Sequence, residues 1–221
     1  MKNLYYPILI TVLLSSCVSS KKYSTFVIGK LQADFIAKDS LQNQEWLTIN
    51  TDKIPQAENQ YEQLKSSFIP AIIYWGWNST IECAIDPSIT ATWIKNSIYH
   101  AADSLNLAEK AKGRQIVINL KQVPGKFLYE NKGMAIIFLV AYSVSGQESI
   151  SPAPINLVAE IETKSGEASH FKGEVSIPNN GQPMNNIWKS SKKFTWAYLE
   201  EYKKESQRMG TELVKQLIQN L

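Results

Sequence analysis

The chain has 221 residues, of which 44% are hydrophobic and 19% charged, as in an ordinary globular protein. Its net charge is only +3, and its basic residues cluster no further than pairs, which argues against a nucleic-acid partner. Two cysteines exclude a disulfide-rich framework, so a hydrophobic core must stabilise the fold.

The first residues have the features of a secretory signal. Lys2 supplies a positive charge, and an almost uninterrupted apolar run follows from residue 4 to residue 14. A membrane-spanning helix needs about 20 apolar residues, and this run is about half as long. The sequence therefore predicts a signal peptide that is removed from the mature chain.

The segment Leu14-Ser15-Ser16-Cys17 resembles the lipobox of bacterial lipoprotein precursors, in which small residues precede a lipidated cysteine. The resemblance implies that residues 1–16 are cleaved and that Cys17 carries covalent lipid, with no other cofactor expected. The alternative is an ordinary signal or a short anchor helix that ends at an unmodified Cys17. Two or more acyl chains hold a protein stably in a membrane, which makes the bilayer the first expected partner.

The residues after Cys17 bear on location. Lipoproteins kept in the inner membrane carry an aspartate directly after the cysteine, and this chain has Val18 there. By that resemblance we expect the outer membrane. The neutral and then basic segment 18–22 favours its periplasmic face over the cell surface, and residues 17–22 are expected to form a lipidated tether.

Hydrophobic periodicity predicts the elements of the first half of the mature chain. We expect a short strand at 23–29, an irregular segment at 30–63 with a short strand at 46–49, and two short strands within 68–85. Asp86 and Pro87 form a typical helix start, and a buried stripe continues the helix to about residue 107.

The second half reads as strands followed by a helix. Alternation predicts a half-buried strand at 116–120, and the apolar run 134–144 predicts a central strand covered on both faces. An antiparallel hairpin at 155–177, a polar loop at 178–186 and a final amphipathic helix at about 199–217 follow.

This order of elements predicts a single α+β domain over residues 23–221, with an antiparallel or mixed sheet and two main amphipathic helices packed on it. From about residue 81 to residue 221, the pattern is similar to small periplasmic lipoproteins that serve as transport-accessory or lipopolysaccharide-assembly subunits. The similarity is one of pattern and length and rests on no diagnostic motif.

Residues that could carry catalysis are few. His100 and His170 are the only histidines, and neither lies in a motif for metal binding or nucleophilic catalysis. Glu160 and Glu162 share one face of a strand, where solvated carboxylates are expected more often than a catalytic pair. Cys83 alternates with Ile81 and Ile85, which favours a buried thiol over a reactive one. We therefore expect no catalytic site, no metal site and no enzyme.

Aromatic side chains are the remaining candidates for a binding surface. Tyr74, Trp75 and Trp77 surround a glycine, and Trp188 precedes the final helix. Exposed aromatic clusters mark interfaces, whereas buried ones belong to the core. We expect a non-enzymatic accessory or assembly subunit of the cell envelope with a protein partner. The alternative is a lipoprotein that binds a glycan or lipid through these aromatics.

Overall fold

The computed structural model describes residues 18–35, 44–70, 73–137, 141–165 and 168–221, so the signal and Cys17 lie outside the described residues. The chain forms one α+β domain, which confirms the predicted fold class. Its elements, in chain order, are α2 (Ser20–Phe35), β1 (Leu47–Asn50), β2 (Gln60–Pro70), β3 (Tyr74–Ala84), α3 (Pro87–Ser104), α4 (Leu107–Ala111), β4 (Gln115–Gln122), β5 (Lys126–Ile137), β6 (Tyr142–Pro152), β7 (Leu157–Ser165), β8 (Ala168–Ile177), β9 (Met184–Asn185) and α5 (Ser191–Gln219).

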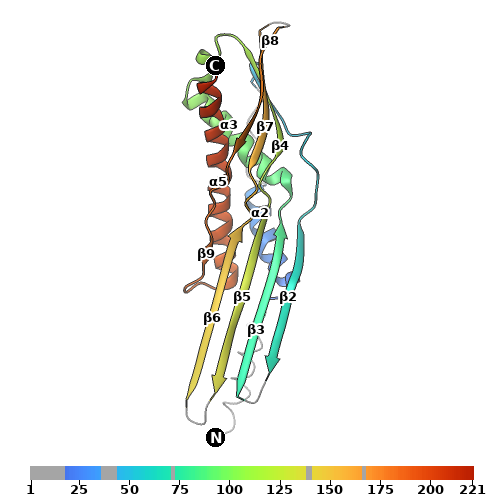
Figure 1. Ribbon diagram of the computed structural model, residues 1–221, viewed down its shortest axis with the longest axis vertical. Helices are drawn as coiled ribbons and strands as arrows, with labels where there is room; N and C mark the ends of the chain where they lie inside the picture. Colours follow the sequence, from blue (N-terminus) through green and yellow to red (C-terminus); the bar gives the residue numbers. More distant parts are fainter. Residues whose placement is uncertain (1–17, 36–43, 71–72, 138–140, 166–167) are drawn as a thin grey trace.

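The strands form two sheets that follow one another along the long axis of the molecule (Figure 1). The first sheet has the order β1-β4-β7-β8, in which β1 runs parallel to β4 and the other pairs are antiparallel. The second has the order β2-β3-β5-β6-β9 and is antiparallel throughout. Its four long strands extend well past the helices at one end of the molecule.

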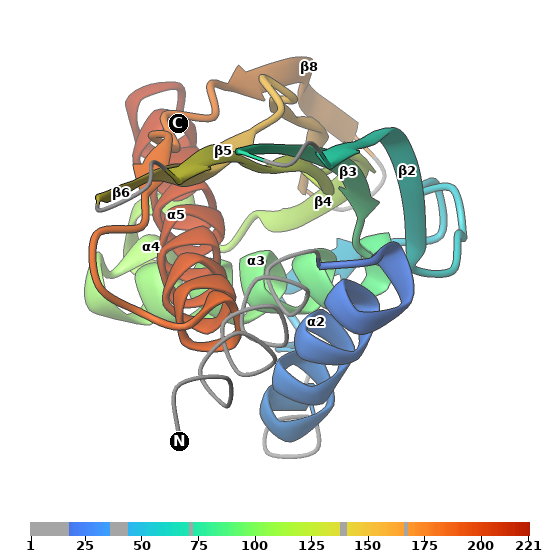
Figure 2. The ribbon, with the colours of Figure 1, turned by 90° about the horizontal axis from the view of Figure 1, so that it is seen from below.

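Helices cover one side of these sheets. Figure 2 shows α2 and α5 on the same side of the five-stranded sheet, with α3 between them. The start of α3 is capped as predicted, because the Asp86 carboxylate accepts a hydrogen bond of 2.8 Å from the Ser88 amide. None of the helices in the described ranges is both long and apolar enough to cross a membrane.

Two hydrophobic clusters fill the space between helices and sheets. One joins the four-stranded sheet to α3 and the second half of α5, and includes Ile98, Ile118 and Leu213. The other joins the five-stranded sheet to α2 and the first half of α5, and includes Ile81 and Tyr198. The long helix α5 belongs to both clusters and therefore connects the two sheets.

The predicted strand at 23–29 is wrong, because these residues belong to helix α2. Tyr23, Val27 and Leu31 are spaced four residues apart and are almost completely buried, which is the helical period. The predicted tether also differs from the structure. Val18 is buried, and the Tyr23 amide donates to the Ser19 carbonyl, so the chain is part of the fold from Val18 onward.

The predicted central strand at 134–144 is wrong as well. Its described residues form the end of β5 and the beginning of β6, and Val144 and Tyr142 are 57% and 79% exposed. An apolar run predicts a covered strand only where other elements pack on it. The region predicted as irregular also contains the end of α2 and the first residues of β2. The predicted strands at 46–49 and 116–120, the 155–177 hairpin, and both main helices are confirmed.

Candidate functional site

The most unusual surface of this molecule is the projecting half of the five-stranded sheet. We call it the blade and define it as residues 66–70, 73–79, 131–137 and 142–148, from strands β2, β3, β5 and β6 (Figure 1). Along the blade, β2 has no neighbour on its outer side among the described strands, and β9 pairs with β6 only at Ser149 and Ile150. The described strands therefore leave both edges of the blade open.

The strand register places Trp75 and Trp77 on one face of the blade. Trp77 lies opposite Phe68 on one side and opposite Gly133 on the other. A Cβ atom on Gly133 would lie 2.7 Å from Cε2 of Trp77, so this position needs glycine to leave room for the indole ring. We call the face that carries both tryptophans the inner face, because it continues the side covered by α2 and α5.

Residues that lie opposite one another on neighbouring strands form rows across the sheet. The next row of this face, toward the free end of the blade, is also apolar. Trp75 lies opposite Ala135, and Ala135 lies opposite Val144. Tyr142 lies two residues before Val144 in β6, so its side chain points to the same side of the sheet. Phe68 is 41% exposed, and Val144 and Tyr142 are more exposed still. On the inner face, Phe68, Val144 and Tyr142 are thus exposed, Trp75 and Trp77 are partly buried, and Ala135 is buried.

Tyr74 lies on the opposite, outer face. A Cβ atom on Gly76 would lie 2.8 Å from the Tyr74 hydroxyl, which places Tyr74 on the side of Gly76 and away from Trp75. The outer face is mixed: the row of Asn78 is polar, with Ser67, Lys132 and Gln147, whereas the next row toward the end of the blade contains the exposed Ile69 and Met134. The three predicted aromatics of β3 are therefore divided between the two faces of the blade.

Trp188 lies in the loop between β9 and α5 and is 94% exposed. The loop is attached to β6, because the Asn186 amide donates a hydrogen bond of 2.8 Å to the Glu148 carbonyl. The Asn186 side chain also donates to the Glu148 carboxylate. These bonds bring Trp188 to the base of the blade, on the β6 side.

Sequence analysis missed several exposed apolar residues of this surface, among them Phe68, Tyr142, Val144 and Ile187. Their apolar character is visible in the sequence. The register that aligns Phe68 with Trp77, and Val144 with Trp75 through Ala135, is not, because it depends on pairing between distant segments.

A polar row separates the inner face of the blade from the buried core. Ser66, Ser79, Asn131 and Glu148 lie opposite one another across the four strands. The Trp77 indole donates a hydrogen bond of 3.0 Å to the side-chain oxygen Oδ1 of Asn131, and the Ser79 hydroxyl donates one of 3.2 Å to the backbone carbonyl of Val18. The row satisfies polar groups at the point where the helices stop covering the sheet.

Tyr129 lies one row deeper, within the core, and stacks on Tyr23 with ring centroids 4.1 Å apart. The Tyr129 hydroxyl donates a hydrogen bond of 2.6 Å to the Glu148 carboxylate. Burial, together with this bond, raises the pKa of Tyr129. Tyr129 therefore stays a neutral donor. It fixes the Glu148 carboxylate at the base of the blade.

The residues considered for catalysis lie apart from the blade. Cys83 is fully buried, and burial raises the pKa of its thiol, which disfavours the nucleophilic thiolate. His100 is exposed late in α3 and lines a shallow pocket of about 320 Å³ with Ser97 and Gln207. The His170 side chain lies outside the described residues. Within the described part of the chain, no three acidic, histidine or cysteine side chains are grouped to hold a metal ion.

Glu160 and Glu162 lie in β7, on the first sheet, and each contacts lysine. The Lys53 ammonium lies 2.9 Å from Glu160, and Lys172 lies 3.4 Å from it. The hydrogen bond from Lys53 is the main reason why the pKa of Glu160 falls to about 2. Glu162 lies 3.5 Å from Lys164. The arrangement is a surface network of ion pairs, in which the lowered pKa of Glu160 favours its ionised form.

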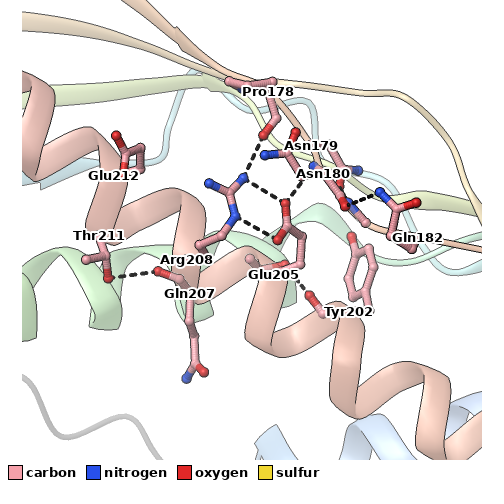
Figure 3. A network of polar contacts seen from close by, with 12 residues as sticks. Pro178, Asn179, Asn180, Gln182, Tyr202, Glu205, Gln207, Arg208, Thr211 and Glu212 are labelled. Carbon is pink, nitrogen blue, oxygen red and sulfur yellow. Dashed lines mark hydrogen bonds and ion pairs between the residues drawn. The ribbon is translucent and has the colours of Figure 1, made fainter.

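A second polar network fastens the connection between the two sheets to α5 (Figure 3). Arg208 donates twice to the Glu205 carboxylate and once to the Pro178 carbonyl, each at 2.8 Å. The Glu205 carboxylate also accepts a hydrogen bond of 2.7 Å from the backbone amide of Asn180. Nε and Nη2 of Arg208 and both carboxylate oxygens of Glu205 are thus hydrogen-bonded within the chain. The network therefore acts as a structural clamp.

Among the described residues, the apolar inner face of the blade, with Trp188 at its base, thus has the character of a binding site, and Cys83, His100, Glu160 and Glu162 lie outside the blade. No protein-family model, curated protein or solved structure matches this chain.

Proposed function

We propose that this chain is a bacterial lipoprotein, anchored through lipid on Cys17 at the periplasmic face of the outer membrane. There it serves as a non-enzymatic accessory or assembly subunit of the cell envelope. The lipobox supports the anchor. The blade supports the accessory role, because exposed apolar patches and open sheet edges are features of surfaces that bind partners.

The single observation that carries the accessory role is the open β2 edge of the blade. The described strands leave the outer side of β2 unpaired over Gln60–Pro70, and the nearby Ile69 side chain is 56% exposed. A segment of a partner protein can add to such an edge as a further strand, with main-chain hydrogen bonds supplying affinity. The natural partner is an envelope protein held within reach of the anchored domain.

Two experiments test the two parts of this proposal. Replacing Cys17 by serine is expected to abolish acyl labelling and to release the chain from the membrane fraction. A photo-crosslinking amino acid at Ser67, in the β2 edge, is expected to give one adduct of defined mass in living cells. The same crosslinker at Lys110, an exposed residue of α4, is the matched control and should give none.

Loss of the Ser67 adduct in Cys17→Ser cells would show that the contact needs the anchored location. Unchanged fractionation of the Cys17→Ser chain would contradict the anchor. Equal crosslinking at Ser67 and Lys110 would contradict a specific edge contact.

A glycan-binding or lipid-binding lipoprotein is the second candidate function, and the common face of Trp75 and Trp77 is the observation that favours it. Aromatic rings on one face form a platform on which sugar rings stack. Protection of Trp77 and Trp188 from acrylamide quenching by soluble envelope glycan fragments would favour this candidate over the accessory role.

A further inference from the structure

The inner face of the blade differs from an ordinary exposed sheet in its composition. Beyond the polar row, its described side chains are aromatic or aliphatic, with Phe68, Trp75, Trp77, Ala135, Tyr142 and Val144 in neighbouring rows. Glycines at positions 133 and 146 complete the row of Trp77. This face continues the side that α2 and α5 cover deeper in the sheet, yet no described element covers it (Figure 1).

The start of the mature chain lies at the border of this face. The Val18 carbonyl accepts a hydrogen bond from Ser79, which belongs to the polar row at the base of the blade. Residue 17 is joined to Val18 by a single peptide bond, so lipid attached there begins within one residue of this point. From Ser79 to Trp75 the strand rises about 13 Å, so the apolar rows and the lipid attachment point are close neighbours.

The two faces of the blade suit a membrane surface better than a membrane interior. The inner face is apolar beyond the polar row and carries both tryptophans, while the outer face combines polar side chains such as Lys132 and Gln147 with the exposed Ile69 and Met134. Open strand edges have unpaired amides and carbonyls, which cannot enter the hydrocarbon region of a bilayer. Tryptophan and tyrosine side chains prefer the interface, where the ring contacts acyl chains and the polar group stays near water.

Charge supports the same orientation. Trp188 is almost fully exposed beside the base of the blade; Lys189 follows it in the loop, and Lys192 and Lys193 lie in the first turn of α5. Lys21 and Lys22 are exposed at the beginning of α2, close to the lipid attachment point. Basic side chains near a bilayer surface are attracted by anionic lipid headgroups.

From these observations we infer that the inner face of the blade lies flat on the bilayer that holds the lipid of Cys17, with its aromatic side chains at the depth of the headgroups. The inference rests on the anchor of the proposed function and adds a second contact with the membrane. The domain is then held in one fixed orientation, with the outer face and the β2 edge turned toward partners.

The test uses the purified lipidated protein in vesicles of phosphatidylcholine and phosphatidylglycerol, with part of the phosphatidylcholine brominated on its acyl chains. Bromine quenches tryptophan fluorescence on contact. Val144→Asp places a charge on the inner face, and Ser145→Asp, the next residue of the same exposed strand, places the same charge on the outer face. About half or more of the quenching is expected to disappear in Val144→Asp and to remain in Ser145→Asp, because a carboxylate is expelled from acyl chains.

Tyr142→Asp, with Ser143→Asp as its matched control, repeats the test at a position that is 79% exposed, in case Val144→Asp fails to fold. Far-ultraviolet circular dichroism and urea unfolding of each variant identify a folding failure. Acyl labelling of every variant is measured in parallel, and all four are expected to be labelled like the parent chain.

Absence of quenching in the labelled parent chain would overturn the inference while leaving the anchor intact. Quenching of Val144→Asp and Tyr142→Asp as strong as that of the parent chain would overturn it in the same way. So would a dimer that Val144→Asp dissociates, because a second copy of the chain would then cover the inner face. A parent chain without acyl label would instead overturn the anchor. Quenching of that unlabelled chain by added vesicles would still support the membrane contact of the blade, and its absence would overturn both.

Discussion

The two halves of the five-stranded sheet share the same strands and alternate in the same way, but the described helices cover only one of them. In the covered half, Ile81 and Tyr129 face α2 and α5 and have no exposed surface. In the blade, Val144 and Tyr142 face the same side and are mostly exposed. The boundary is the polar row of Ser66, Ser79, Asn131 and Glu148. Alternation along a strand therefore decides which face is apolar, while the helices decide whether that face is core or binding surface.

The largest expected effect comes from truncating one apolar residue in each half. Ile81→Ala removes packed methyl groups from a fully buried site and should lower the free energy of unfolding by about 2–5 kcal/mol. Val144→Ala should change it by less than about 0.5 kcal/mol, because Val144 is exposed. Urea unfolding of both variants measures the difference. Similar losses at the two sites would show that the blade is covered in solution.

A smaller effect is expected in the helices that limit the covered region. A Cβ atom on Gly210 of α5 would lie 2.8 Å from the Ile94 carbonyl of α3, so Gly210→Ala should force the helices apart and cost about 1–3 kcal/mol. Gly29 in α2 has no other atom within 4 Å of such a Cβ. Gly29→Ala should therefore stabilise the chain by up to about 1 kcal/mol, through helix propensity. Thermal unfolding distinguishes the two directions, and a loss in both variants would contradict the tight crossing.

The clamp that ties the sheet connection to α5 should contribute less again. Glu205→Gln keeps the shape of the side chain but removes its charge toward Arg208, and should cost about 1 kcal/mol. Glu201→Gln is the control, because its ion pair with Lys204 is exposed and should be worth less than about 0.5 kcal/mol. Chemical unfolding measures both. An equal cost would mean that the clamp is an ordinary surface pair.

The smallest effect concerns acid, and it should come from the first sheet and not from the apolar face of the blade. The hydrogen bond from Lys53 lowers the pKa of Glu160 from 4.5 to about 2. Because the folded pKa is the lower one, this carboxylate stabilises the fold above pH 4.5, and its contribution is lost as the pH falls from 4.5 toward 2. Glu160→Gln should flatten the fall of stability in this window, measured by urea unfolding at several pH values. An unchanged slope would contradict the role of Lys53, and salt should weaken the effect by screening.

Much of the fold follows from local features of the sequence. Asp86 and Pro87 set the beginning of α3, and the hydrophobic stripe of α5 is visible without any knowledge of its neighbours. The alternation around Cys83 correctly predicted its buried side chain. The segment at Tyr23 was predicted as a strand because a short apolar run fits both periods, and only packing of Tyr23, Val27 and Leu31 on the sheet decided for a helix.

The candidate site was predictable only in part. The sequence by itself determined that Trp75, Trp77 and Trp188 are candidates for an aromatic surface, and that side chains two apart in a strand share a face. Both depend only on residue identity and local backbone geometry. Tertiary structure decided that Trp77 shares a face with Phe68, that Tyr74 does not, and that Trp188 lies at the base of the blade. The physical reason is that register and coverage arise from contacts between residues far apart in the chain, and no local pattern records them.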